Sequence, residues 1–150
     1  MASPASIAKH PIHPMFVVFP IALWIFSFVS DLIYFLGWGG PVWQDVAFRS
    51  MAGGVVGALL AAIPGFIDFL SLSGRSRKIA TIHMSLNLLL VLLYAVNLWI
   101  RAGAAELGRG PVVLSGIALV ILFISGWLGG SLVYVHATAV ECENQGVGNY

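Results

Sequence analysis

The sequence predicts an all-α protein, a four-helix transmembrane bundle that runs up-down-up-down. Hydrophobic residues make up 59% of the 150-residue chain and charged residues only 9%, whereas a soluble domain carries about 25% charged residues. So few charges cannot cover a water-facing surface, and the apolar side chains must therefore face lipid. Four apolar stretches, each near the roughly 20 residues that span a bilayer core, lie at about 14–36, 47–70, 79–100 and 111–135.

These four stretches use almost the whole chain, so residues 1–150 should form a single integral membrane domain. The connections between them are short, which makes consecutive helices antiparallel neighbours. The first stretch is too long for a signal peptide, and no small-residue cleavage site follows it. We therefore expect it to remain as a membrane span.

An unusual segment, His10-Pro11-Ile12-His13-Pro14, precedes the first span. Each proline restricts the histidine before it to extended geometry. The segment should therefore enter the bilayer as a stiff, non-helical arm that holds its imidazoles in fixed directions. An interfacial cap whose histidines face water and lipid headgroups is the alternative for this pair taken alone.

Glycines four residues apart indicate where the helices meet. Gly53 and Gly57 have this spacing in the second span, as do Gly126 and Gly130 in the fourth. Small residues at this interval let two backbones approach closely in a membrane. We expect both pairs to lie at helix–helix contacts.

Polar residues in the third span share one face. At 100° per residue they fall within an arc of roughly 80°: His83, Asn87, Tyr94, Asn97 and Arg101. Lipid does not accept such a stripe, so it should face the bundle interior. The two residues at its far end are expected to bond to neighbouring helices.

The histidines and one aspartate fall at a single face of the membrane when the four spans are antiparallel. They are His10, His13, His83, His136 and Asp68. Each helix thus contributes at least one potential ligand or proton carrier to one layer. Ionisable side chains inside a membrane-spanning bundle are energetically costly, so a layer of them indicates function.

Three chemistries suit this layer, and the spacing does not separate them. Haem b takes one or two histidines at its iron, a transition-metal ion takes three or four nitrogen and oxygen ligands, and a proton relay uses the same groups without metal. For haem, His83 is the expected anchor, with His13 or His136 opposite. For a metal ion, His10 and Asp68 join these as ligands or as groups that orient an imidazole.

The other end of the bundle should be structural. Asp31, Arg49 and Arg101 fall at one depth there. Opposite charges near an interface usually pair, so we expect ion pairs that set the helix register.

Loop charges predict the orientation. The second loop carries Arg75, Arg77 and Lys78, whereas the first loop, 37–46, has no Lys or Arg. Positive loops stay in the cytoplasm, which would place both termini there as well. A net charge of +1 gives no support for nucleic-acid binding, and no HExxH, CxxC, P-loop, GxSxG or dinucleotide motif indicates an enzyme.

Several stretches together resemble an uncharacterised family of small bacterial four-helix membrane proteins that open with an HPxHP motif. They are HPIHPMFVVFPIAL (His10 to Leu23), GFIDFL (Gly65 to Leu70), HMSLN (His83 to Asn87) and GWLGGSLVYVH (Gly126 to His136). The resemblance implies a multi-pass protein of the bacterial inner membrane. Because relatives occur fused to Rieske-type domains, it also implies a link to redox chemistry. The chain departs from the family pattern at Val18, Ser131 and Ala137.

The leading hypothesis is a redox-associated membrane protein that binds haem b or a transition-metal ion through this histidine layer. One alternative is a non-enzymatic accessory subunit of a larger electron-transfer or pigment complex. Another is a proton or metal-ion transporter, although four helices enclose little pore volume. The expected partners are the lipid bilayer together with other membrane or redox proteins, or a second copy of the chain.

Overall fold

The computed structural model describes residues 3–8, 10–104 and 108–135. In this part of the chain four helices are long and apolar enough to cross a membrane, which confirms the all-α bundle. The helices are α1 (Ile12–Phe35), α2 (Val42–Leu70), α3 (Gly74–Ala102) and α4 (Arg109–Tyr134). Before them, β1 (Ser6–Ile7) and β2 (His10–Pro11) form a short antiparallel pair.

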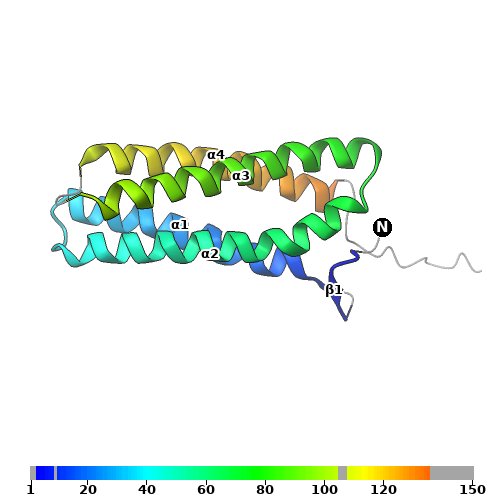
Figure 1. Ribbon diagram of the computed structural model, residues 1–150, viewed down its shortest axis with the longest axis horizontal. Coiled ribbons are helices and arrows are strands. Elements are labelled where there is room, and N and C mark those ends of the chain that lie inside the picture. Colours follow the sequence, from blue (N-terminus) through cyan, green and yellow to red (C-terminus); the bar gives the residue numbers. More distant parts are fainter. Residues whose placement is uncertain (1–2, 9, 105–107, 136–150) are drawn as a thin grey trace, which may run out of the picture.

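The helices form two layers (Figure 1). α1 packs chiefly on α2, and α3 packs chiefly on α4, while contacts between the layers are sparser. α1 and α3 therefore lie diagonally across the bundle. We call the end that carries the start of α1 and the α2–α3 connection the histidine end.

Helix α1 begins earlier than the sequence indicated. It starts at Ile12, directly after Pro11, so Pro14 lies in its first turn. A proline there loses no hydrogen bond, because the first amide groups of a helix have no partner within it. The prediction of an extended arm is therefore wrong for His13, which is helical, and holds for His10, which lies in β2.

The glycine pairs behave differently from one another. A Cβ at Gly57 would lie 3.2 Å from Cδ of Pro20, and one at Gly53 would lie 3.3 Å from Leu23, so α2 approaches α1 closely. Around Gly126 and Gly130, no described atom lies within 4 Å of a built Cβ. The prediction of a close helix contact is confirmed for the α2 pair and wrong for the α4 pair.

The middle of the bundle joins the two layers through aromatic rings. Trp24 of α1 stacks on Tyr94 of α3 with ring centroids 4.3 Å apart and planes 13° from parallel. The other members of this buried cluster are Met51, Leu90, Ala118, Leu119 and Leu122. The packed centre separates the histidine end from the opposite end.

A buried ion pair stabilises the opposite end. The guanidinium of Arg101 donates to both carboxylate oxygens of Asp31, at 2.8 and 2.6 Å. Its Nε donates to Asn97, whose own amide donates to Pro111 and Ser115 of α4. The predicted interior stripe of α3 is thus confirmed, since these side chains link α1, α3 and α4.

Arg49 does not take part in this network. It pairs with Asp45 at 2.8 Å, four residues earlier on the same helix, and both side chains are exposed. The expectation that Arg49 would join separate helices is therefore wrong, because its partner lies one turn away on α2.

Candidate functional site

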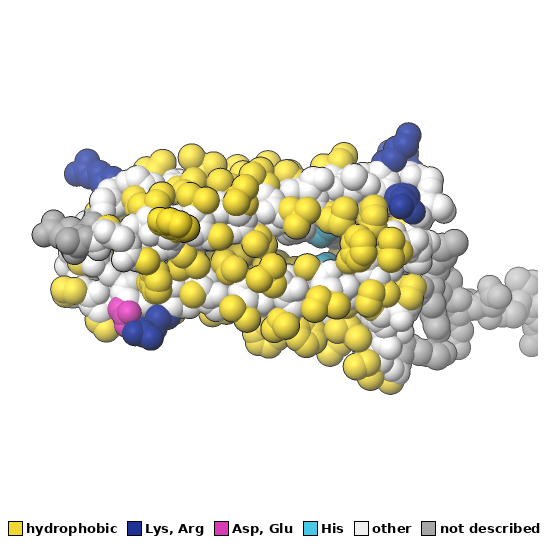
Figure 2. Space-filling view, in the orientation of Figure 1, with side chains coloured by type: hydrophobic (Ala, Val, Ile, Leu, Met, Phe, Trp, Pro, Cys, Tyr) yellow, Lys and Arg dark blue, Asp and Glu magenta, His cyan; other side chains and the backbone are white. Residues whose placement is uncertain are grey.

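Two histidines from diagonal helices face each other between the layers. The ring centroids of His13 and His83 lie 6.3 Å apart, and their planes are 87° from parallel. Both side chains are partly buried. Figure 2 shows histidine atoms at the bottom of a hollow between rows of hydrophobic side chains. On this face the bundle is therefore hollowed down to histidine side chains.

Helix α2 fixes the first imidazole. Nδ1 of His13 donates to the backbone carbonyl of Ala61 at 2.8 Å. The ring lies against α2 at Gly65, where a Cβ would come within 2.6 Å of Nδ1. Pro64, buried between these two positions, has no amide hydrogen, so the helical hydrogen bond to the carbonyl of Leu60 is missing in this turn. The Ala61 carbonyl and the absence of a side chain at Gly65 together leave room for the ring on α2.

Helix α4 holds the second imidazole in the same manner. Nδ1 of His83 donates to the backbone carbonyl of Ser125 at 2.8 Å, and the Ser125 hydroxyl lies 3.0 Å from the same nitrogen. A Cβ at Gly129 would lie 3.1 Å from this ring. Asn87 donates to Nε2 at 3.1 Å and also to the His83 carbonyl at 2.8 Å.

These bonds determine where the imidazole protons lie. A carbonyl oxygen can only accept, so Nδ1 of His13 and Nδ1 of His83 each carry a hydrogen. In the neutral imidazole, Nε2 is then the nitrogen with the lone pair, and in His83 this lone pair accepts from Asn87. Metal-bound histidines commonly show this arrangement, with one nitrogen donating to a backbone carbonyl and the other on the metal. The pair can therefore offer two Nε2 ligands.

The other predicted site residues lie elsewhere. His10 is exposed and bonds to the carbonyl of Ala8 at 2.8 Å. Asp68 accepts from the hydroxyl of Ser3 at 2.6 Å and from the amide of Ala5 at 3.1 Å, so it fastens the N-terminal segment to α2. His136 lies outside the described residues. Within the described ranges, no three His, Cys, Asp or Glu side chains lie together as a metal site.

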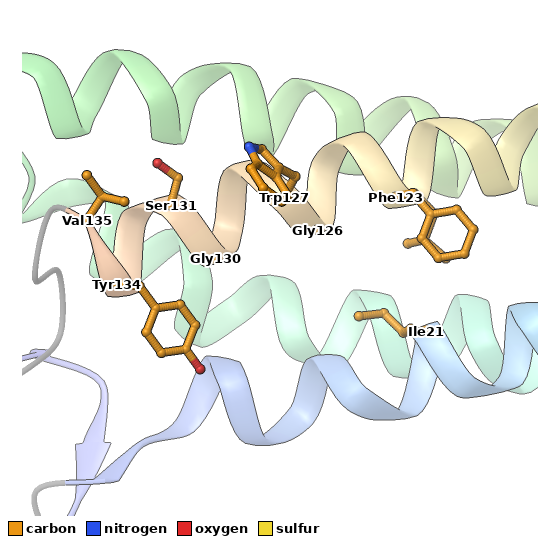
Figure 3. A pocket seen from close by; sticks show the side chains of 9 residues that line it. Ile21, Phe123, Gly126, Trp127, Gly130, Ser131, Tyr134 and Val135 are labelled. Atoms are coloured by element: carbon orange, nitrogen blue, oxygen red, sulfur yellow. The ribbon is translucent and has the colours of Figure 1, made fainter.

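An apolar groove of about 550 Å³ lies between α1 and α4 (Figure 3). It is lined by Ile21 of α1 and by α4 residues Leu122, Phe123, Gly126, Trp127, Gly130, Ser131, Tyr134 and Val135. Its volume is in the range of small-molecule sites, about 300–1,000 Å³. The sequence did not reveal this groove, since its glycine spacing is also that of a close helix contact.

Sequence reasoning also missed the groups that orient the imidazoles. The acceptors are the backbone carbonyls of Ala61 and Ser125, and a carbonyl has no residue-type signature. Gly65 and Gly129 gave the available signal, because each lies four residues after one of those acceptors. A glycine at that interval leaves room for a ring against the helix.

Comparison with known proteins identifies the family of the chain. A family described as predicted membrane protein (DUF2231) matches residues 9–142. No curated protein and no solved structure matches the chain. The match covers all four helices and both histidines of the pair. The chain therefore belongs to the DUF2231 family of membrane proteins.

Proposed function

We propose that the protein binds haem b between His13 and His83 and carries electrons within the membrane. The observation that supports this most is the matched pair of imidazoles. Each is held by Nδ1 on a backbone carbonyl at 2.8 Å, and each is left with Nε2 as its ligand atom.

The separation of the rings suits ligation of one iron from opposite sides. A histidine nitrogen lies about 2.0–2.1 Å from a bound transition metal, and the ring centroid lies roughly 1.1 Å farther, so two opposed imidazoles have centroids about 6–6.5 Å apart. With the same bond lengths, two imidazoles on a tetrahedral metal ion would have ring centroids about 5 Å apart. The distance between His13 and His83 is 6.3 Å.

The number of ligands favours haem over a bare ion. Zinc, copper or iron alone takes three or four protein ligands, whereas the described residues place two histidines together. Haem needs only one or two from the protein, because the porphyrin supplies the others. The two-layer bundle suits a flat cofactor, since one imidazole comes from each layer.

Haem would supply a one-electron couple between ferric and ferrous iron. The chain's own residues then orient both ligands and exclude water from them. The amide of Asn87 donates both to Nε2 of His83 and to the backbone carbonyl of His83. It can give up the first hydrogen bond, which frees Nε2 for the iron, and keep the second. The carbonyls of Ala61 and Ser125 hold both rings in place and raise the basicity of the ligand nitrogens.

The test is haem binding by single histidine variants. The protein is produced with ample haem supply, purified in detergent, and measured for haem per chain, metal content and absorption. We expect one haem per chain in the wild type and a loss of at least tenfold in haem affinity in His13→Ala or His83→Ala.

His10→Ala is the matched control, because His10 is exposed and bonds only within its own turn. It should bind haem as the wild type does. A wild type that takes up no haem, even when haem b is added to the purified protein, would refute the proposal. Stoichiometric zinc or copper in its place would favour the metal-ion alternative.

A further inference from the structure

We infer that the groove between α1 and α4 seats the apolar edge of the porphyrin. This inference rests on the proposed haem function and deepens it. It adds the orientation of the cofactor in the protein.

The groove and the histidine pair share the same turns of α4. Ser125 and Gly129 contact the His83 ring, and the next residues, Gly126 and Gly130, line the groove. The groove therefore lies at the depth of His83, around the edge of α4 from it. Neither histidine lines the groove itself, so the inferred ligand would bridge from the imidazoles past α4 into this space.

The orientation of the layers leads to the same place. The histidines that would hold haem come one from α1 and one from α3. A flat cofactor held by both would occupy the space between the layers and would reach the two sides where the layers part. One side is the groove (Figure 3), and the other is the hollow that shows histidine atoms (Figure 2).

The lining selects the uncharged part of the ligand. Among the described residues that line the groove, none is Asp, Glu, Lys or Arg. Methyl and vinyl groups suit this surface, whereas ionised propionates would be costly there. The propionates should point instead toward the histidine end, where Arg75, Arg77 and Lys78 lie exposed in the first turns of α3.

The two glycines of the groove have no packing role in the described structure. Glycine weakens a helix interior, and at Gly53 and Gly57 that cost is offset by close approach of α1. At Gly126 and Gly130 no described atom comes within 4 Å of a built Cβ. The open space at these two glycines is therefore available to a cofactor held by the histidine pair.

The test fills the groove and leaves both histidines in place. Gly126→Trp and Gly130→Trp each place a ring in the groove, at positions where a built Cβ meets no described neighbour. We expect at least a tenfold loss of haem affinity, measured by titration of the purified protein with haem b. Helical content and elution volume in detergent should match the wild type.

Gly110→Trp is the control, because Gly110 lies on the same helix, is equally open and is remote from the groove. It should bind haem as the wild type does. Wild-type affinity in both groove variants would overturn this inference while leaving the histidine proposal intact. A wild type that binds no haem would overturn both. Loss of a co-purified lipid or quinone from the groove variants, with haem binding unchanged, would assign the groove to that ligand.

Discussion

At the scale of single residues, the bundle contains two polar clusters with different chemistry. The histidine pair is neutral and held by backbone carbonyls. The opposite cluster is charged, and Asp31 and Arg101 are almost fully buried there, with side-chain exposures of 0% and 4%. A neutral pair can present lone pairs to a ligand, whereas a buried ion pair already satisfies its own charges. The first cluster is thus suited to binding and the second to structure.

Removing one partner of the buried pair should destabilise the protein strongly. Asp31→Ala leaves the guanidinium of Arg101 without its carboxylate in an apolar interior, which costs about 3–5 kcal/mol. Unfolding of the purified protein in mixed detergent micelles with increasing dodecyl sulfate measures this loss. Asp45→Ala, which removes only the exposed pair with Arg49, is the control and should leave the midpoint nearly unchanged. Equal shifts in both variants would contradict a structural role for the buried pair.

At the scale of helices, the spacing between α1 and α2 determines the position of His13. Its ring lies against Gly65, and farther along α2 a Cβ at Gly57 would lie 3.5 Å from the backbone nitrogen of Pro20. Any side chain at position 65 must push the ring away, because the neighbouring atoms belong to the imidazole itself. The helix pair therefore forms half of the proposed site before any ligand binds.

Gly65→Ala should reduce haem affinity without unfolding the bundle. The new methyl group would come within 2.6 Å of Nδ1, so the ring must leave the carbonyl of Ala61 and tilt away from its ligand position. A tenfold loss or more is expected in a haem titration. Gly53→Ala, which meets only the flexible end of Leu23, should keep wild-type affinity. Unchanged affinity in Gly65→Ala would show that His13 needs no support from α2.

Helix-scale features also show how far the sequence could predict the structure. Hydropathy and short loops were sufficient for the four spans, and the polar stripe of α3 correctly indicated an interior face. The start of α1 was not predictable from the proline rule alone, because Pro14 is harmless in a first turn. Gly126 and Gly130 were misread because one spacing serves both a close helix contact and an open groove. The backbone acceptors of the imidazoles leave no mark in the sequence.

At the scale of the whole molecule, unpaired positive charge is greater at the histidine end. Arg75, Arg77 and Lys78 are exposed there. At the opposite end Arg109 is exposed, while Arg49 pairs with Asp45 and Arg101 with Asp31. The positive-inside rule then favours a histidine end that faces the cytoplasm. We propose this orientation in a bacterial inner membrane, with haem near the cytoplasmic side.

Single-cysteine labelling tests the orientation. In a Cys142→Ser background, Ser73→Cys adds a thiol to the exposed α2–α3 connection, and Ala104→Cys adds one to the exposed residues after α3. A membrane-impermeant maleimide applied to intact spheroplasts should label only the cysteine at position 104. Both should react after the membrane is opened. Labelling of position 73 alone in intact spheroplasts would reverse the orientation and leave the site unchanged.

The central claim is that one iron is held by both His13 and His83. Low-temperature electron paramagnetic resonance of the ferric, haem-loaded protein tests this most directly. Two imidazole ligands with planes 87° apart should give a low-spin, highly anisotropic signal, and His83→Ala should convert any retained haem to a high-spin form. A high-spin signal in the wild type, or a low-spin signal that survives in both His13→Ala and His83→Ala, would contradict the account.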